Sequence, residues 1–384
     1  MAEQSTTREI TVRTIRDQQA WDAIEPDWSL LFAASRYAAT PLRFSWLRNW
    51  WRCYGSIYSP NARGLRVITI WRGRQLIGAL PLYLSTTHVP FLTIRRIGFI
   101  STGETQGEET CPDYMNMLCL PGEEQLCVRK FQETVRRESW DFIELLNVPE
   151  HSPLLNEFGW SEGSRETIPA EGCPIADLQG GFDAYLRRLN SKHRKNARRV
   201  LRSVAEADAS LEIADASNAA TSFDDLIRIH QERWNAVGKP GCFGATRFTQ
   251  FHRALALEGV PQGHAALARL MINSRPAAVI YGFITGRKFD VYQCGVSIHD
   301  RGPVASPGIA AHLLLMAALC DRGVTCYDLL SGASQYKHAL ATRIVPLYTV
   351  RAWRPTVRAL AHKSLIRFGR TVKPELHDPH SQVA

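Results

Sequence analysis

The stretch from residue 292 to residue 337 constrains the fold more than any other part of the chain. It reads YQCGVSIHDRGPVASPGIAAHLLLMAALCDRGVTCYDLLSGASQYK. Its pattern predicts a strand ending near Val296, a Gly/Pro-rich loop from Arg301 to Pro307, and a helix from Gly308 to a stop at Gly323. A β-rich run over 324–330 then opens onto a loop and a second helix. This order is that of a βαβ unit, whose ligands bind beside the carboxyl ends of the strands.

The helix start at Gly308 is a candidate anion site. A helix N-terminus next to a flexible loop presents N–H groups and the positive end of the helix dipole, which suits a pyrophosphate. A βαβ unit that only holds the fold together would show the same pattern, because glycine loops are common. The pattern alone leaves both interpretations open.

The second half of the chain repeats the layout of the first half. LRVITIWRGRQLIGALPLYL from Leu65 corresponds to LARLMINSRPAAVIYGFI from Leu267, and DFIELL from Asp141 corresponds to TCYDLL from Thr325. Each half then reads as a strand hairpin, a strand, a helix and a strand. A Gly-containing acidic loop over 101–112 accounts for the different spacing. The sequence therefore predicts a duplicated α/β fold.

Composition narrows the class of protein. A chain of 384 residues suggests two domains, and its 45% of hydrophobic residues is ordinary for a soluble protein. The chain has no run of 18 apolar residues, and the polar start MAEQSTTREI lacks an apolar core, so we expect neither a transmembrane segment nor a secretory signal. Nine cysteines without a C-x-x-C pair indicate reduced thiols in a cytoplasmic protein and no metal site.

Positive charge is concentrated in the second half. Residues 1–180 hold 18 Lys and Arg against 22 Asp and Glu (net −4), whereas residues 181–384 hold 28 against 15 (net +13). An anionic partner would suit this half, whether coenzyme A, tRNA, a nucleotide-linked sugar or a membrane surface. An amphipathic helix predicted from Phe182 to Val204 carries much of the charge, on Arg188, Lys192, Lys195, Arg199 and Arg202. It is either a phosphate-contacting helix or a solvated face.

Three patches resemble one family: PLRFSWLRNWW, IRIHQERWNAVGKPGCF and the ending SPG-x9-AL-x3-G-x3-YDLLSG-x3-YK. They resemble the BioF2-like or CelD-like acyltransferases, a branch of the GNAT superfamily that is similar to the FemAB peptidyltransferases. The resemblance covers about residues 30–350. It implies an α/β (α+β) fold of two GNAT-like domains in tandem, each a mixed twisted sheet flanked by helices. We expect these domains at 1–175 and 176–372, with a disordered tail over 373–384.

The resemblance also implies a reaction. An amine attacks the thioester of acyl-CoA, such as acetyl-CoA, directly, and the donor is gripped by its phosphates. Gly308, Ile309 and Ala310 match the final G-x-A of the superfamily's pyrophosphate loop, and Arg301 lies nearby. The leading Gln or Arg of that motif is replaced by Ala305, which departs from the pattern. The acceptor would be a small molecule or saccharide, such as an amino sugar in cell-envelope or exopolysaccharide synthesis.

Three catalytic residues follow from the same comparison. Asp328 ends a predicted strand, where a carboxylate serves as base, orients the amine, or caps the loop at Ser331. Tyr336 falls where GNAT enzymes commonly place the acid that protonates the leaving thiolate. Lys337 resembles the lysine of the aromatic-Lys pair in FemAB proteins, where its charge would stabilise an oxyanion or hold a phosphate.

The acceptor pocket is expected to use residues from both halves. His230, Arg233 and Trp234 lie on one predicted helix, and Tyr292 should project from the central strand near the thioester. The remaining two, Asp113 and Tyr114, resemble the family's DY pair. No G-x-S-x-G elbow occurs and no cysteine has neighbours in sequence that would activate it, which disfavours covalent catalysis.

Two alternatives stay open at this point. The donor could be aminoacyl-tRNA, as in FemAB proteins, which the basic second half and the missing Gln or Arg favour; other nucleic-acid binding is not expected. The chain could instead be a non-catalytic scaffold of a polysaccharide-synthesis complex with degenerate GNAT folds. Retention of Asp328, Tyr336 and Lys337 together favours an enzyme. The sequence does not predict the oligomeric state.

Overall fold

The computed structural model describes residues 9–59, 63–89, 92–156, 165–299, 302–332 and 334–372. These residues form two compact units. Unit 1 comprises the described residues within 9–104, 110–170 and 347–372, and unit 2 those within 105–109 and 171–346. The last strand and helix, which we expected in the second domain, therefore lie mostly in unit 1, because the strand pairs with β6 from Leu347 to Trp353. Arg301 and the tail over 373–384 lie outside the described residues.

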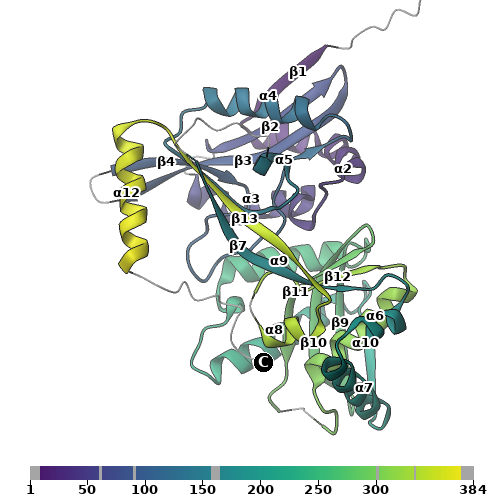
Figure 1. Ribbon diagram of the computed structural model, residues 1–384. Helices are drawn as coiled ribbons and strands as arrows, with labels where there is room; N and C mark the ends of the chain where they lie inside the picture. Colours follow the sequence, from purple (N-terminus) through teal and green to yellow (C-terminus); the bar gives the residue numbers. More distant parts are fainter. Residues whose placement is uncertain are drawn as a thin grey trace, which may run out of the picture. The chain divides into compact units, whose positions relative to one another are not determined.

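Unit 1 is built on a mixed sheet (Figure 1) with the strand order β1–β2–β3–β4–β6–β13 and with β5 beside β3. All neighbours are antiparallel except β4 and β6, which run parallel. The strands are β1 (Ile10–Ile15), β2 (Leu65–Arg72), β3 (Gln75–Val89), β4 (Leu92–Phe99), β5 (Leu118–Cys119), β6 (Phe142–Pro149) and β13 (Arg343–Trp353).

Helices with apolar faces pack on this sheet. They are α1 (Gln18–Asp22), α2 (Glu25–Ala34), η1 (Thr40–Leu42), α3 (Phe44–Tyr58), α4 (Glu124–Arg137), α5 (Pro153–Asn156) and α12 (Val357–Val372). The aromatic stripe of α3 is buried, as its helical spacing predicts, and Trp50 stacks on Tyr54 with ring centroids 5.4 Å apart. Helix α12 lies against β4, where Trp353 stacks on Phe142.

In unit 2 the strands of the mixed sheet follow the order β7–β12–β11–β10–β9–β8. Neighbours are antiparallel except β11 and β12, which are parallel like β4 and β6 of unit 1. The strands are β7 (Arg165–Asp177), β8 (Ala209–Ile213), β9 (Ala265–Ile272), β10 (Arg275–Thr285), β11 (Lys288–Val296) and β12 (Cys326–Asp328). The predicted arrangement, a mixed sheet flanked by helices in each half, is confirmed.

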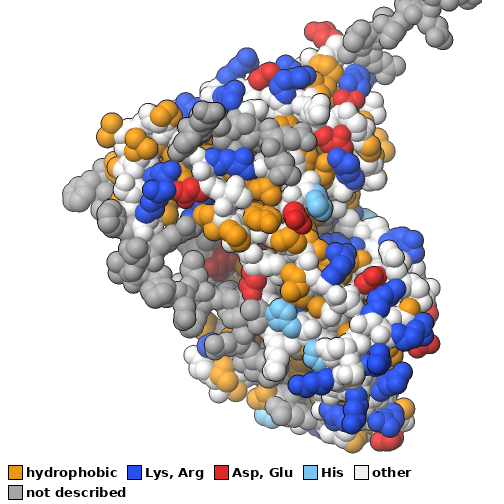
Figure 2. Space-filling view, in the orientation of Figure 1, with side chains coloured by type: hydrophobic (Ala, Val, Ile, Leu, Met, Phe, Trp, Pro, Cys, Tyr) orange, Lys and Arg blue, Asp and Glu red, His pale blue; other side chains and the backbone are white. Residues whose placement is uncertain are grey.

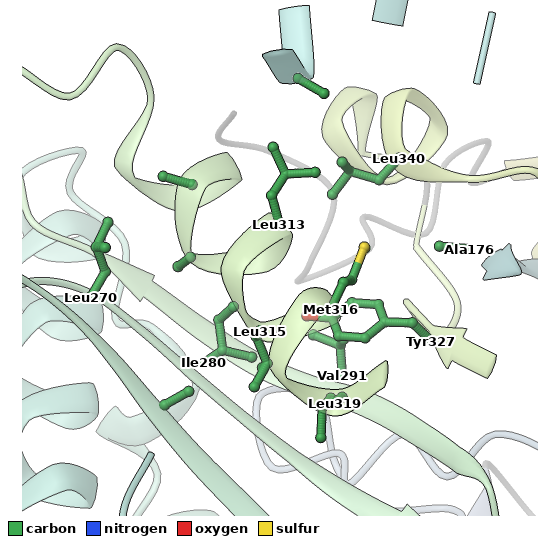
Figure 3. Packing of buried hydrophobic residues seen from close by; sticks show 14 of the residues in the cluster. Ala176, Leu270, Ile280, Val291, Leu313, Leu315, Met316, Leu319, Tyr327 and Leu340 are labelled. Carbon is green, nitrogen blue, oxygen red and sulfur yellow. The ribbon is translucent and has the colours of Figure 1, made fainter. Parts of the chain in front are cut away.

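Helices cover both faces of the unit 2 sheet. They are α6 (Phe182–Arg188), α7 (Ser191–Ala205), α8 (Ala219–Asn235), η3 (Cys242–Gly244), α9 (Thr246–Gly259), α10 (Pro307–Asp321) and α11 (Gln335–Leu340). Ile280 packs in the core of α7 and α10, and its neighbour Tyr281 contacts Phe223 of α8. Successive strand residues point to opposite faces, so α8 lies on one face of the sheet and α10 on the other. Figure 3 shows the α10 side, where Leu313, Met316 and Leu319 meet strand residues.

The basic segment forms two helices where the sequence predicts one. The chain leaves helical geometry at Leu189 and Asn190, and the Asn190 side chain accepts a hydrogen bond from the N–H of His193 as the N-cap of α7. Asparagine is a strong N-cap because its side chain satisfies a backbone donor that the helix leaves unpaired. The predicted buried face survives the break, since Leu186, Ala197 and Val200 all join the unit 2 core.

Candidate functional site

The parallel strands β11 and β12 part soon after they meet. They pair only from Lys288 opposite Cys326 to Asp290 opposite Asp328. Strand β12 then ends, while β11 continues to Val296 with β10 on its other side. The second half of β11 therefore has an edge at which β12 no longer pairs, at the carboxyl ends of parallel strands, where ligands of α/β sheets bind.

A β-bulge at Tyr292 determines which side chains of β11 point to each face of the unit 2 sheet. Val291 pairs with Gly282 and Gln293 pairs with Tyr281, which leaves Tyr292 as an extra residue. Its ring lies 4.2 Å from the ring of His252 in α9, on the α8 and α9 face. The next residue, Gln293, contacts Cys242 on that same face, whereas Cys294 reaches the α10 face.

On the α10 face, Cys294 meets Tyr336. Its sulfur lies 3.5 Å from the Tyr336 hydroxyl, and the Tyr336 ring stacks on that of His312 with centroids 5.3 Å apart. Burial and the neighbouring Cys294 raise the pKa of Tyr336 well above its usual value, and burial likewise raises the pKa of Cys294. Both groups therefore stay protonated at neutral pH.

A buried histidine supports this pair. Nδ1 of His312 lies 2.8 Å from the Tyr327 hydroxyl, and burial together with the nearby Lys337 charge lowers the pKa of His312 to about 3. The imidazole is therefore neutral at physiological pH. It fixes the Tyr336 ring by stacking and adds no charge beside it.

Lys337 is buried against the loop that follows β12. Its Nζ donates hydrogen bonds to the carbonyl oxygens of Leu330, at 3.4 Å, and of Ser331. Its charge acts on His312 and on the Cys294 thiol, so Lys337 belongs to the same cluster. The structure thus brings Tyr336 and Lys337 together around Cys294, as adjacent residues on a short helix.

Asp328 holds the same loop by a hydrogen bond to its backbone. Its Oδ1 accepts a hydrogen bond from the N–H of Leu330 (2.9 Å), and its Oδ2 lies 3.3 Å from Nζ of Lys288, which also pairs with Asp290 at 2.7 Å. Burial opposes a charge on Lys288, but the two carboxylates outweigh it and raise the pKa of the ammonium group. The Asp328 carboxylate is fully buried, so these contacts favour the loop-capping role among those considered from the sequence.

The candidate phosphate-binding residues lie at the start of α10. Ser306 is the N-cap, and a Cβ on Gly308 would come within 3.0 Å of the Val296 side chain, so the glycine lets the helix start approach the end of β11. Ile309 is half-buried and Ala310 is fully buried in the core. The preceding loop touches α7, because the N–H of Ala305 donates to the Ser203 hydroxyl (3.1 Å).

The predicted acceptor residues of α8 lie next to a thiol that the sequence did not single out. Nε2 of His230 lies 3.6 Å from Sγ of Cys242, and Nε2 of Gln293 donates to the same sulfur at 3.2 Å. Trp234 is 5.8 Å from the His230 ring, and the Arg233 charge acts on Cys294. Cys242 follows His230 by twelve positions, and only the fold of the KPGCF loop brings them together.

Asp113 and Tyr114 belong to unit 1. Asp113 is buried and accepts a hydrogen bond from the side-chain amide of Asn147 at 3.2 Å. Tyr114 has a φ of 63°, an uncommon conformation for a residue with a side chain. The other described candidates all lie in unit 2.

Basic side chains cover the exposed side of α6 and α7. Figure 2 shows Lys and Arg gathered over the part of unit 2 where Figure 1 places these helices. Arg188 pairs with Asp177 at 3.9 Å, and among the described residues no other ion pair involves this surface. Its exposed members are Arg187, Arg188, Lys192, Lys195, Arg198, Arg199 and Arg202. We call these seven residues the α7 basic surface.

Comparison with known proteins identifies the class. Residues 191–338 match the model of the acetyltransferase (GNAT) domain, and this segment contains β11, α10, β12 and both Tyr336 and Lys337. Residues 191–338, most of the second unit, are therefore similar to a GNAT acetyltransferase domain, and the chain is a transferase. No curated protein is similar enough in sequence to match.

Solved structures share the fold over nearly the whole chain. FemX aligns with a TM-score of 0.58 at 12% identity, covering 92% of this chain and 99% of that one. L-PGS from Bacillus licheniformis aligns at 0.52 and 10%, covering 94% and 98%. A conserved protein of unknown function from Bacteroides thetaiotaomicron aligns at 0.53 and 13%, covering 89% and 100%. At these identities the likeness shows the fold, a tandem GNAT-like and FemAB-like arrangement.

In the described part of the chain, no helix is long and apolar enough to cross a membrane. Nor do three or more His, Cys, Asp or Glu side chains of these residues gather closely enough to hold a metal ion.

Proposed function

We propose that the protein is an acyl-CoA-dependent N-acyltransferase whose donor site lies in unit 2. The observation that carries this proposal is the contact between Cys294 and Tyr336 beside the edge of β11 that β12 leaves open. A thioester lying along that edge would place its sulfur near a phenol that burial keeps protonated. Tyr336 then protonates the leaving thiolate.

Neighbouring groups supply the other requirements of the reaction. The first turn of α10, at Gly308 and Ile309, offers N–H groups to the donor's pyrophosphate. Lys337, held by two loop carbonyls, supplies positive charge for a phosphate or for the oxyanion of the tetrahedral intermediate. Asp328 holds the loop between these parts through the N–H of Leu330.

Titration calorimetry with acetyl-CoA and a long-chain acyl-CoA tests the donor class. Wild-type protein should bind one of them in the micromolar range, and Gly308→Trp should abolish binding because a side chain at 308 meets Val296. Glu258→Trp is the control, since it adds the same side chain at an exposed position of α9, a helix that does not form this phosphate site. Absence of binding to either ligand would sink the proposal. Binding that survives in Gly308→Trp would move the donor site elsewhere.

The acceptor belongs to the same proposal. We assign an amine, such as an amino sugar or a small amine linked to cell-envelope or exopolysaccharide synthesis, as the resemblance to the CelD-like branch implies. A panel of amino sugars and diamines, assayed by release of the CoA thiol, tests the assignment. Faster thiol release with a neutral sugar alcohol than with any amine would contradict it.

A second candidate donor is aminoacyl-tRNA, which the α7 basic surface favours. This surface adjoins the loop before α10 through the contact between Ala305 and Ser203, so a polyanion on it would lie beside the predicted phosphate site. Filter binding with aminoacylated and uncharged tRNA separates the two donors. Tight binding that prefers the aminoacylated form, and that weakens in Lys195→Gln/Arg198→Gln/Arg202→Gln, would support tRNA; equal, strongly salt-dependent binding of both forms would be non-specific.

A further inference from the structure

The thiol of Cys242 sits in a hydrogen-bond network whose donor and acceptor roles are fixed by backbone atoms. The network lies on the α8 face of β11 and comprises His230 and Gln231 of α8, Cys242 of η3, and Gln293 of β11. None of the roles assigned to the donor site involves it. Because a carbonyl oxygen only accepts and a backbone N–H only donates, each role follows in turn.

The first role concerns the histidine. Nε2 of Gln231 donates to the carbonyl oxygen of Pro240 at 2.7 Å, which turns Oε1 of the same amide towards Nδ1 of His230, 3.1 Å away. An amide oxygen cannot donate, so Nδ1 carries the hydrogen. Nε2 of His230 is then left with its lone pair facing Sγ of Cys242 at 3.6 Å.

The second role concerns the sulfur. Oε1 of Gln293 accepts a hydrogen bond from the N–H of Cys294 at 3.2 Å, which directs its NH2 group to Sγ of Cys242 at 3.2 Å. The sulfur therefore accepts from Gln293 and donates its S–H to His230. An amide donor at the sulfur stabilises negative charge as the thiol loses its proton.

A glycine makes the network fit. Gly241 has a φ of 65°, and a Cβ there would overlap Oε1 of Gln231. The loop therefore needs glycine at this position both for its backbone and for the space that Gln231 occupies. Nucleophile, base and a third group that orients the base are the parts of an activated nucleophile.

Burial raises the pKa of the Cys242 thiol to about 12, although the Gln293 hydrogen bond opposes the rise. At neutral pH the group is thus a thiol that requires a base at the moment of attack, and His230 is that base. The Cys242 residue as a whole is only partly buried, and the acetylation experiment below measures whether a small electrophile reaches its sulfur.

We propose that Cys242 is a nucleophile that accepts the acyl group before the amine does, in place of the direct attack that the family resemblance implies. His230 takes the thiol proton at Nε2 while Sγ attacks the thioester carbonyl; the bond between that carbon and the donor sulfur breaks, and His230 passes the same proton to the donor thiolate. The acyl group is then held as a thioester on Cys242. An amine attacks this thioester, Sγ leaves with its electron pair, and the proton released by the amine restores the thiol.

The location suits a relay of this kind. Cys242 contacts Gln293, and the adjacent residue in β11 is Cys294, which contacts Tyr336. The Cys242 sulfur thus contacts the β11 residue that precedes Cys294, and the side chains of Gln293 and Cys294 lie on opposite faces of the strand, in the part of β11 that β12 leaves unpaired. The acyl-enzyme rests on the proposed function for its acyl-thioester donor.

The test uses a donor that needs no phosphate site. Whole protein is incubated with the acetyl thioester of N-acetylcysteamine, quenched in acid and analysed by peptide mass spectrometry. Cys242 should gain one acetyl group faster than any other thiol, and His230→Gln should slow this acetylation about 10²-fold. The control Cys320→Ser removes a thiol that adjoins the Asp321 carboxylate, and it should leave the rate at Cys242 unchanged.

Three results decide the matter. Acetylation of Cys242 no faster than that of Cys320, or an equal rate in folded His230→Gln, overturns the proposal. If His230→Gln fails to fold, as judged by near-UV circular dichroism, Gln231→Ala gives the same test. This variant removes the amide oxygen that keeps the hydrogen of His230 on Nδ1, so acetylation of Cys242 should slow. Because the small thioester bypasses coenzyme A, rapid acetylation without acyl-CoA binding would reject the proposed donor and leave the nucleophile standing.

Discussion

Tyr336 and Cys294 lie side by side in a buried environment that holds both in their protonated forms. The raised pKa keeps the Tyr336 phenol protonated at neutral pH, so a proton is present where a departing thiolate would need one. Stacking on His312 fixes the ring without placing a charge beside it, since that imidazole is neutral above about pH 3. Packing thus holds the side chain that we propose as the acid of the reaction.

Tyr336→Phe tests this role. The variant removes the hydroxyl and keeps the ring, so we expect acyl transfer to fall about 10²-fold while the Kd for acyl-CoA stays within about twofold. Steady-state kinetics and calorimetry measure the two quantities, with Tyr348→Phe in unit 1 as control. A parallel loss of affinity would instead indicate that Tyr336 binds the donor.

His312 should make the protein sensitive to acid. Its pKa is about 3 when folded and about 6.5 when unfolded, so between these values the unfolded chain binds a proton that the folded chain refuses. The free energy of unfolding should therefore fall as the pH drops from about 6.5, by about 1.4 kcal/mol per pH unit from this residue. Denaturant titrations at several pH values should show a smaller slope in His312→Asn than in the exposed control His299→Gln. Equal slopes would contradict the assignment.

At the scale of single elements, β11 places candidate functional side chains on both faces of the sheet. The alternation of a regular strand would have put Tyr292 and Cys294 on the same side. The bulge at Tyr292 instead turns Tyr292 and Gln293 towards α8 and α9 and gives Cys294 to Tyr336. A bulge that depends on pairing with β10 leaves no local mark in the sequence.

The KPGCF loop is the second element whose role depends on tertiary contacts. The sequence placed His230 and Trp234 on one helical face, but it could not show that the chain returns at Cys242. One signal was present in retrospect: a Pro-Gly pair shortly after a helix favours a tight reversal. It predicts a turn without stating which side chain the turn presents.

Gly241→Ala and Gly238→Ala separate the two functions of that loop. Both glycines have positive φ, 65° and 72°, so each alanine should cost about 1 kcal/mol of unfolding free energy through the backbone. Only the Gly241 change collides with Gln231, since the space around Gly238 is open. Denaturant unfolding should show the larger loss for Gly241→Ala, and acetylation of Cys242 should slow in that variant alone. Equal effects on acetylation would argue against the orienting role of Gln231.

At the scale of the whole molecule, the repeated hydrophobic pattern was sufficient to predict the two mixed sheets, because burial on each face sets strand and helix periodicity. The TCYDLLSG…YK pattern also placed Tyr336 and Lys337 correctly next to one another on a helix after β12. The sequence pattern could not predict which side chain each of these residues contacts. Cys294, His312 and Lys288 are separated from their partners by 15 to 42 positions in the chain.

The uneven charge also has a molecular explanation. Much of the positive excess of the second half lies on the α7 basic surface, on the outer side of helices whose inner side joins the core. Among the described residues, only Arg188 of this surface pairs with a carboxylate, that of Asp177. The exposed cations of the surface can therefore contact an anionic ligand. A basic surface alone does not distinguish between CoA and RNA, so only measured binding of each ligand separates the two.

Hydrogen exchange with and without acetyl-CoA tests the central claim, that unit 2 grips an acyl thioester at the open edge of β11. Saturating ligand should slow exchange in peptides that cover the first turn of α10 and the helix α11, which carries Tyr336 and Lys337. The changes should be smaller in β4 and α4, which correspond in unit 1 to β11 and α10. Protection confined to unit 1, or no protection at a concentration at which calorimetry detects binding, would contradict the account.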